Sequence, residues 1–315
     1  MTQTLADIGE SALIERITKD VVKGPQVRIG PGDDAAVISV DNGLVISTDV
    51  MNENVHFRND WVSGIDVGHR CVGAAVADIE AMAAVPTSVL IALSAPSSTP
   101  VAWVDQFITG VLEECDDARV SLIGGDVSSA DSIAIAVTAL GETRGRPVVL
   151  RGGAQPGDAV AYKGRLGWAA AGWAVLSRGF RSPRALVNAY QRPQIPYGGG
   201  AEAARYEVTA MTDVSDGLVA DVRHIAFGSR VVIDIDSGTL PIPEPLQAVA
   251  HATGRDPLEL VLSGGQDHAL VATFPFGGVP MAWTVIGRVE ALDGRDPVVL
   301  VDGQEWLGPS GWTHF

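Results

Sequence analysis

The sequence predicts a protein of two domains, an α+β domain formed by residues 1–146 and an α/β domain formed by residues 147–315. The chain has 315 residues, of which 46% are hydrophobic, and this is enough to build two separate cores. Up to about Gly145, the apolar patterns indicate helices stacked on one layer of strands. The segment "TRGRPVVLRGGAQPGD" then interrupts the pattern with Gly, Pro and Arg, a composition typical of a domain boundary.

The first domain is expected to alternate helices with buried strands. Apolar residues recur at helical spacing in residues 7–19 and 101–118. A long helix of small residues is predicted for 66–86, closed by Pro86. The stretch "AAVISVDNGLVIST" is typical of two apolar strands joined by an Asp-Asn-Gly turn, so we expect a hairpin there. Further strands are predicted at 88–96, 120–126 and 132–142.

The second domain is expected to open with the strand "AVAYKG" and the helix "GWAAAGWAVLSRG". A loop rich in Pro, Tyr and Gly follows, "QRPQIPYGGG". The stretch "VTAMTDVSDGL" predicts a strand that leads into a helix ending near Ala226, and "RVVIDIDSG" predicts another strand. A Gly turn that feeds a strand is predicted in "LVLSGGQDHALVATF".

Charge and cysteine content narrow the class of protein. The 38 acidic and 22 basic residues give a net charge of −16, which argues against nucleic acid or an anionic membrane as a partner. No apolar run reaches the roughly 18 residues of a membrane span. Cys71 and Cys115 show no C-x-x-C spacing, and the N-terminus has no basic region followed by an apolar run. We therefore expect a reduced, cytoplasmic protein.

The stretch "IGPGDDAAVI" contains two glycines followed by two aspartates. Gly30, Gly32 and Ala35 fit the dinucleotide pattern G-x-G-x-x-G/A. That pattern needs a helix to begin at the glycines, whereas strands are predicted here. Asp33 and Asp34 would also repel a phosphate unless a cation lay between them. The loop therefore favours metal ions that hold the phosphates over direct phosphate binding.

Aspartates with neighbouring hydroxyl groups recur at the ends of apolar strands. Taken singly, each aspartate could be a turn residue or a helix cap. Their repetition favours magnesium, which prefers hard oxygen ligands and bridges carboxylates to substrate phosphates. Asp78 lies among apolar residues of the long helix, where burial requires a cation or hydrogen bonds, although a position on an exposed Glu80 side is the alternative. The five sites are Asp33 with Asp34, Ser47 with Thr48 and Asp49, Asp78, Asp126, and Asp213 with Ser215 and Asp216.

Other chemistries find little support in the sequence. There is no His-Glu-x-x-His motif or Cys/His cluster for zinc, no Gly-x-Ser-x-Gly elbow, and no Gly-Lys dipeptide for a P-loop. His56 lies close to the Asp49 segment and is held as a candidate. Arg151 could bind a phosphate bidentately, or make an ordinary surface ion pair.

The motifs together resemble the thiamine-monophosphate kinase family, in order and over nearly the whole chain. They are "GPGDDAAV", "ISTD" followed by "HF", "ADIEAMAA", "GGD", "LRGGAQPGD", "TDVSDGL", "LSGGQDHAL" and "GWTHF". The resemblance extends to aminoimidazole ribonucleotide synthetase, selenophosphate synthetase and the hydrogenase-maturation dehydratase, which bind ATP without a P-loop. It implies that residues 1–146 bind ATP and magnesium and pair their strands with those of a second subunit, so that the protein is a homodimer.

The resemblance also implies roles for individual residues. Asp126 and Asp213 are expected at the centre of catalysis. Gly125, Arg151 and Ser215 are expected to contact ATP, while His56, Gln266 and Trp312 are expected to line the thiamine-phosphate site. Several Mg²⁺ ions are expected on Asp34, Ser47, Thr48, Asp49, Asp78, Asp126, Asp213 and Asp216.

The implied reaction passes the γ-phosphoryl group of ATP to thiamine monophosphate in line. Two departures from the family pattern stand out, "GGQD" in place of "GGED" and "AVAD" in place of "NLSD". The first affects a substrate contact at Gln266, and the second leaves Asp78 in place. The alternatives are a non-catalytic protein that binds nucleotide or thiamine phosphate, and another ATP-dependent synthetase of the superfamily. Selenophosphate synthetase would carry a reactive cysteine near its N-terminus, and the maturation dehydratase would end in a cysteine.

Overall fold

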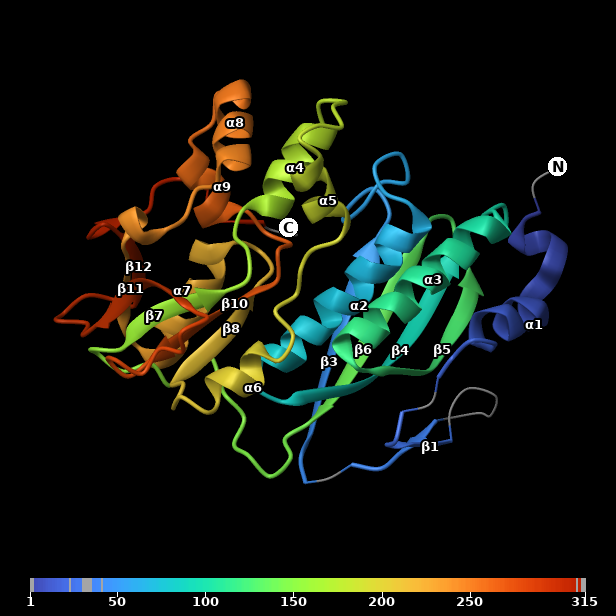
Figure 1. Cartoon of the computed structure of the whole chain (residues 1–315), viewed down its shortest axis with the longest axis horizontal. Coiled ribbons are helices and arrows are strands. Elements are labelled where there is room, and N and C mark those ends of the chain that lie inside the picture. Colours follow the sequence, from blue (N-terminus) through green and yellow to red (C-terminus); the bar gives the residue numbers. More distant parts are fainter. Residues whose placement is uncertain (1–2, 23, 30–35, 41, 310, 313–315) are drawn as a thin grey trace. The chain divides into compact units, whose positions relative to one another are not determined.

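The computed structural model describes residues 3–312 except 23, 30–35, 41 and 310 (Figure 1). The chain divides into two compact units. Unit 1 comprises Met1–Ile79 and Ala84–Arg146, and unit 2 comprises Glu80–Ala83 and Pro147–Phe315. Both units mix helices and strands, as predicted. Among the described residues, no helix is both long enough and apolar enough to cross a membrane.

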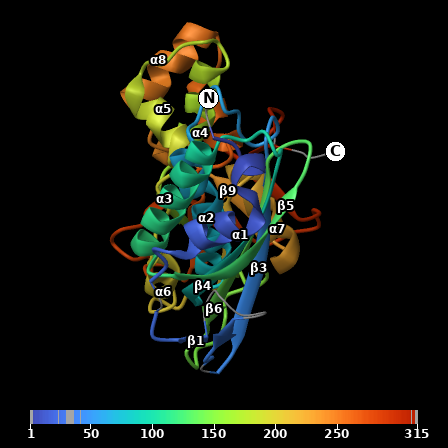
Figure 2. The ribbon, with the colours of Figure 1, turned by 90° about the vertical axis from the view of Figure 1, so that its right-hand side faces the viewer.

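Unit 1 is built on a four-stranded sheet with the strand order β3-β6-β4-β5. Neighbouring strands are antiparallel except β4 and β5, which are parallel. Helices α2 and α3 cover one face of the sheet, and the other face of β3 is open (Figure 2). The bounds are β3 Leu44–Asn52, β4 Val85–Ala95, β5 Ser121–Ser129, β6 Ala134–Glu142, α1 Leu5–Thr18, α2 Gly64–Ala81 and α3 Val101–Ala118.

The predicted hairpin in "AAVISVDNGLVIST" is wrong, although strands lie on both sides of the turn. The short strand β2 (Val37–Ile38) pairs with β1 (Val27–Ile29), and β3 pairs with β6 instead. Strand β3 is nine residues long and finds in β6 a partner of the same length. The short strand β2 could not satisfy the backbone groups of so long a strand.

Helices α2 and α3 pack closely because glycines face each other at their crossing. A Cβ atom on Gly68 would collide with the backbone oxygen of Phe107, and one on Gly110 with that of Ile65. His69 joins the two helices on the same flank. Its Nδ1 lies 2.6 Å from Glu114 Oε2 and its Nε2 lies 2.9 Å from Glu113 Oε2. The small residues of the predicted long helix thus serve close helix packing.

Unit 2 contains a seven-stranded sheet with the strand order β13-β12-β9-β11-β7-β10-β8. Only β9 and β12 are parallel among its described pairs, so this sheet is mixed rather than built from parallel repeats. Helix α7 packs along β8, β9 and β12, while α4 packs on α5, α8 and α9. The strands are β7 Ala159–Lys163, β8 Ala210–Val214, β9 Val232–Ile235, β10 Ala269–Phe274, β11 Thr284–Glu290, β12 Val298–Val301 and β13 Gln304–Glu305. The helices are α4 Trp168–Leu176, α5 Arg184–Gln191, α6 Gly199–Ala203, α7 Leu218–Ser229, α8 Glu244–Thr253 and α9 Pro257–Ser263, with a 3₁₀ turn at Ser237–Thr239.

Glu80 is buried within unit 2, so the side of the long helix that carries it is not exposed there, and the alternative of an exposed position for Asp78 on that side is not supported. Only 4% of its surface is exposed, and its carboxylate accepts hydrogen bonds from the backbone amides of Gly198 at 2.8 Å and Gly200 at 3.0 Å. Burial raises the pKa of Glu80, and these two amides oppose the shift. Within unit 2, Glu80 therefore holds the first turn of α6.

Candidate functional site

The first group of predicted ligands in unit 1 lies where β3 faces α2. Ser47 Oγ donates a hydrogen bond of 2.5 Å to Asp78 Oδ2, and Asp78 is half-buried. The strand pairing places Asp49 beside Val137 of β6, on the same face of the sheet as Ser47. The charge of Asp49 also contributes, after burial and Cys115, to the raised pKa of Cys71 on α2. Ser47, Asp49 and Asp78 therefore share the helix-covered side of β3.

Thr48 and Asp126 lie on the other face of this sheet. Thr138 Oγ1 donates to Thr48 Oγ1 at 3.4 Å. Asp126 on β5 lies opposite Ala92 on β4, and the same row of paired residues continues across β6 to Val50 on β3. Residues in one row point to the same face of the sheet, so Asp126 is on the face of Val50 and Thr48. Three strand spacings of about 4.8 Å place β3 and β5 roughly 14 Å apart. Asp49 and Asp126 of one chain therefore lie on opposite faces of the sheet, too far apart to share one ion.

Gly125 and His56 are positioned by the same sheet. A Cβ atom at Gly125 would collide with the backbone oxygen of Ile91, so only glycine allows β4 and β5 to pair here. His56 follows β3, and its Nδ1 accepts a hydrogen bond of 2.9 Å from the amide of Asn52. An accepting Nδ1 leaves the proton of the neutral ring on Nε2. Asp33 and Asp34 lie outside the described residues.

In unit 2, an acidic cluster forms at the turn between β8 and α7. Asp213 is buried at the end of β8, and its Oδ2 lies 3.1 Å from His268 Nδ1. Asp221 Oδ2 accepts hydrogen bonds of 3.0 Å from the amides of Asp216 and Gly217. Burial raises the pKa of Asp221 to about 7, and the charge of Asp213 adds to the shift. The sequence reasoning missed Asp221, although an acid in the first turn of a helix after an Asp-Gly turn is a usable signal.

Predicted nucleotide and substrate residues converge on the same turn. The amide of Gln266 donates to the backbone oxygen of Ser215 at 2.7 Å, and the amide of Trp312 donates to that of Asp216 at 3.0 Å. The Trp312 residue is 53% exposed. Unit 2 thus brings together Asp213, Ser215, Asp216, Gln266 and Trp312, which are spread over 100 positions of the sequence.

Arg151 lies beside α7 on the exposed surface of unit 2. The hydroxyl of Ser229 at the end of α7 donates to the backbone oxygen of Arg151 at 3.3 Å. Partial burial lowers the pKa of His224, and the charge of Arg151 lowers it further. The guanidinium is therefore near enough to α7 to act on that helix, whose first turn carries the acidic cluster.

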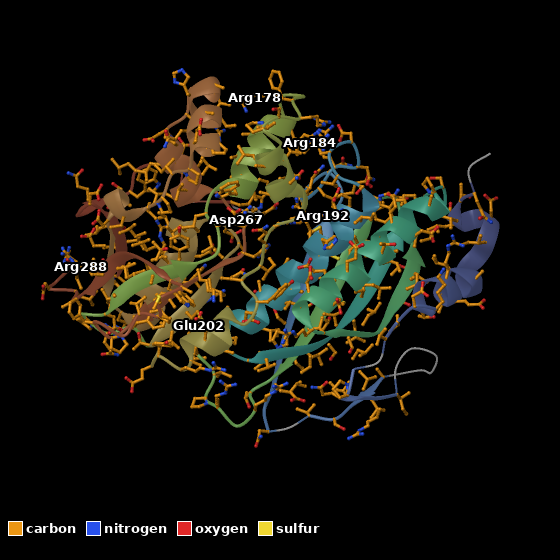
Figure 3. All side chains as sticks on the ribbon, in the orientation of Figure 1. Arg178, Arg184, Arg192, Glu202, Asp267 and Arg288 are labelled. Atoms are coloured by element: carbon orange, nitrogen blue, oxygen red, sulfur yellow. The ribbon has the colours of Figure 1, made fainter. Side chains whose placement is uncertain are left out.

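Asp267 is a second residue that the sequence reasoning missed. It is buried between the 264–268 loop and helix α4, with Oδ1 accepting a hydrogen bond of 2.8 Å from the amide of Ala169 (Figure 3). Burial raises its pKa to about 7, against the effect of the α4 amides. The only signal in the sequence was its place beside Gln266 in "GGQDHAL".

The donor sets fit a hard cation. Carboxylates and hydroxyls are the ligands that Mg²⁺ prefers, and a cation at the unit 2 cluster would offset the burial and the charge of Asp213 that raise the pKa of Asp221. Within the described residues, no three His, Cys, Asp or Glu side chains are already arranged around one point. Substrate phosphates would then complete the coordination of each ion.

Comparison with known proteins agrees with the sequence motifs. The models of the AIR synthase related protein N-terminal and C-terminal domains match residues 32–143 and 155–275. The chain is 45% identical to thiamine-monophosphate kinase of Mycobacterium tuberculosis over 314 residues, which cover 99% of this chain and 93% of that protein.

Two solved structures share the fold over nearly the whole chain. The thiamine-monophosphate kinase from Stenotrophomonas maltophilia K279a matches with a TM-score of 0.82 and 30% identity, covering 95% of this chain and 98% of that one. AaThiL complexed with AMPPCP and TMP matches with a TM-score of 0.78 and 31% identity, covering 100% of both chains. On these grounds, the chain belongs to the thiamine-monophosphate kinase family, whose two domains are those of the AIR synthase related proteins.

Proposed function

We propose that the protein transfers the γ-phosphoryl group of ATP to the phosphate of thiamine monophosphate, giving thiamine diphosphate. The observation that carries this proposal is the convergence of Asp213, Ser215, Asp216, Gln266 and Trp312 at one turn of unit 2. It is supported by 45% identity to a named kinase over nearly the full length, and by the likeness to a structure that holds AMPPCP and TMP.

The proposed reaction does not require a general base. The acceptor is a phosphate oxygen with a second pKa of about 6, so it is already ionised near neutral pH. Catalysis then depends on positioning the two phosphates and neutralising their charge. Bound Mg²⁺ would supply that neutralisation, held by Asp34, Ser47, Thr48, Asp49, Asp78, Asp126, Asp213 and Asp216. Arg151, Ser215 and the backbone at Gly125 would orient ATP.

The thiamine end of the acceptor would be held by His56, Gln266 and Trp312. The exposed indole of Trp312 offers a flat face to an aromatic ring, and its backbone is fixed by Asp216. Gln266 offers a neutral carbonyl acceptor where the family pattern has a carboxylate. His56 presents a donor at Nε2, because Nδ1 is used by Asn52.

Two further properties belong to this proposal. The N-terminal segment 1–146 would bind ATP and magnesium and form the dimer, and segment 147–315 would complete the site. Leu44, Ile46 and Val50 on the open face of β3 are 40%, 59% and 46% exposed, a row of apolar side chains that a second subunit would cover. Both described cysteines are free and buried, which is consistent with a cytoplasmic location.

Turnover of thiamine monophosphate with ATP and Mg²⁺ tests the function directly. The wild-type chain should produce thiamine diphosphate, and Asp126→Asn should lower kcat by about a hundredfold, because it would remove one carboxylate ligand of the Mg²⁺ that neutralises the phosphates. Asp131→Asn is the control, since Asp131 is exposed in the loop after β5. Binding without turnover by the wild type would favour the non-catalytic alternative. Turnover of a different acceptor only would favour another synthetase of the superfamily.

Magnesium should stabilise the protein more at high pH than at low pH. The pKa of Asp221 is raised from 3.8 to about 7, so its contribution to stability is present below pH 3.8 and is lost as pH rises through about 7. Millimolar Mg²⁺ should therefore raise Tm more at about pH 8 than at about pH 6. Differential scanning calorimetry measures this, and Asp221→Asn should reduce the difference. An equal Mg²⁺ effect at both pH values in the wild type would contradict the expectation.

Gln266→Glu should strengthen binding of thiamine monophosphate. A charge-assisted hydrogen bond is worth about 1 to 2 kcal/mol more than a neutral one, so KM should fall roughly tenfold while KM for ATP is unchanged. Gln247→Glu on the exposed side of α8 is the matched control. Steady-state kinetics that show no change in KM would remove Gln266 from the acceptor site, and turnover by the variant alone would make the position catalytic.

Dimerisation predicts a particle of twice the 32.8 kDa chain mass. Leu44→Lys combined with Ile46→Lys should shift the protein toward monomer, because two charges would be buried in the interface. Val285→Lys is the control, since Val285 is 45% exposed on β11 of unit 2. Light scattering coupled to size exclusion gives the masses, and circular dichroism shows whether each variant is folded. A monomeric wild type, or a folded double variant that stays dimeric, rejects this interface.

A further inference from the structure

The loop 264–268 holds two residues in an unfavourable backbone conformation. Gln266 has φ +68° and His268 has φ +50°, in the left-handed region that favours glycine. A residue with a side chain is disfavoured in this conformation, so the conformation persists only where its surroundings impose it.

One side of the loop is fixed by backbone hydrogen bonds to β8 and the turn after it. The amide of His268 donates to the backbone oxygen of Val214 at 3.0 Å, and the amide of Gln266 donates to that of Ser215 at 2.7 Å. These bonds continue the pairing of β10 with β8, in which Ala269 lies opposite Val214. They place Gln266 and His268 over the acidic cluster, where His268 Nδ1 reaches Asp213.

Asp267 fixes the other side of the loop. Its residue is 3% exposed, and its Oδ1 accepts the amide hydrogen of Ala169 in the first turn of α4 (Figure 3). The residue that precedes α4 is Gly167, which has no side chain to cap the helix. Asp267 therefore supplies, from 98 positions away in the sequence, the acceptor that the helix lacks.

Burial of the Asp267 carboxylate is energetically unfavourable. Its Oδ2 is buried and has no hydrogen-bond partner among the described residues, and burial raises its pKa to about 7. A buried carboxylate with one oxygen that accepts no hydrogen bond adds little to the stability of the fold. Its position between two strained residues of the candidate site points to a role in holding them.

We infer that Asp267 is a positioning residue, which anchors loop 264–268 to the first turn of α4 and thereby sets Gln266 for the acceptor and His268 for Asp213. This inference rests on the proposed function, because it takes Gln266 and Asp213 to be the substrate and metal contacts. Asp267 itself touches neither substrate nor metal in this assignment. It links helix α4 to the site through the backbone of the loop.

Kinetics on matched helix-capping variants test the inference. Asp267→Ala should raise KM for thiamine monophosphate about tenfold, equal to 1.4 kcal/mol, with KM for ATP changed less than about twofold. Asp267→Asn keeps an oxygen acceptor for Ala169 and should restore KM to within about threefold of the wild type. Asp256→Ala is the control, because Asp256 caps α9 through a 2.9 Å bond from Leu258 outside the site. Equal KM values in the Asp267→Ala and Asp256→Ala variants would leave Asp267 a merely structural cap and overturn the inference.

Amide hydrogen exchange provides a readout that does not depend on activity. In Asp267→Ala, the amides of residues 264–268 should exchange at least about tenfold faster, while the amides of β10 stay protected and Asp267→Asn resembles the wild type. Unchanged exchange in Asp267→Ala rejects the anchoring itself. If the wild type does not phosphorylate thiamine monophosphate, the proposed function fails, yet the exchange experiment still decides whether Asp267 holds the loop.

Discussion

Repulsion between carboxylates that are close together and partly buried is the constraint on which the candidate site depends. Asp213 and Asp221 are both about 3% exposed, and Asp216 lies at the same turn. Burial and the charge of Asp213 together raise the pKa of Asp221 to about 7. Such a group of acids is tolerable only if a proton or a cation balances it. In an acidic chain without a P-loop, divalent ions would therefore provide the physical route to the two phosphorylated substrates of the proposed function.

Backbone hydrogen bonds, rather than side-chain contacts, hold the segments of the candidate site together in unit 2. The backbone carbonyl groups of the turn after β8 accept hydrogen bonds from the amides of Gln266 in loop 264–268 and of Trp312, so segments far apart in sequence are fixed by main-chain hydrogen bonds. Side chains at the turn then remain available for ligands. In unit 1, the alternation of side chains along β3 positions the candidate ligands. Ser47 and Asp49 lie on one face of β3, and Thr48 lies on the other.

Local patterns in the sequence predicted most elements but not their partners. Helix α3 and strand β6 lie close to the predicted ranges, because apolar periodicity reports which face is buried. The partner of β3 could not be found in this way, since β3 and β6 are separated by some eighty residues and alternation alone does not select between strands. The acids next to glycine were visible as motifs. Asp221 carried only the weaker signal of an acid in the first turn of a helix, and Asp267 only its place beside Gln266. The importance of both comes from burial and from the helix ends that they meet, which only the folded chain defines.

Asp221 and Asp267 both have a pKa that burial raises, but their surroundings give the two carboxyl groups different roles. Burial raises both pKa values to about 7, so both weaken the fold as pH rises through that value. The neighbours decide what relieves each charge. Asp221 faces other carboxylates, and a cation bound by that cluster would relieve the repulsion. Asp267 faces the amides at the start of α4, which oppose its shift without any ligand. Under the proposed function, the first acid would link stability to metal binding, whereas the second holds the loop against a helix without any ligand.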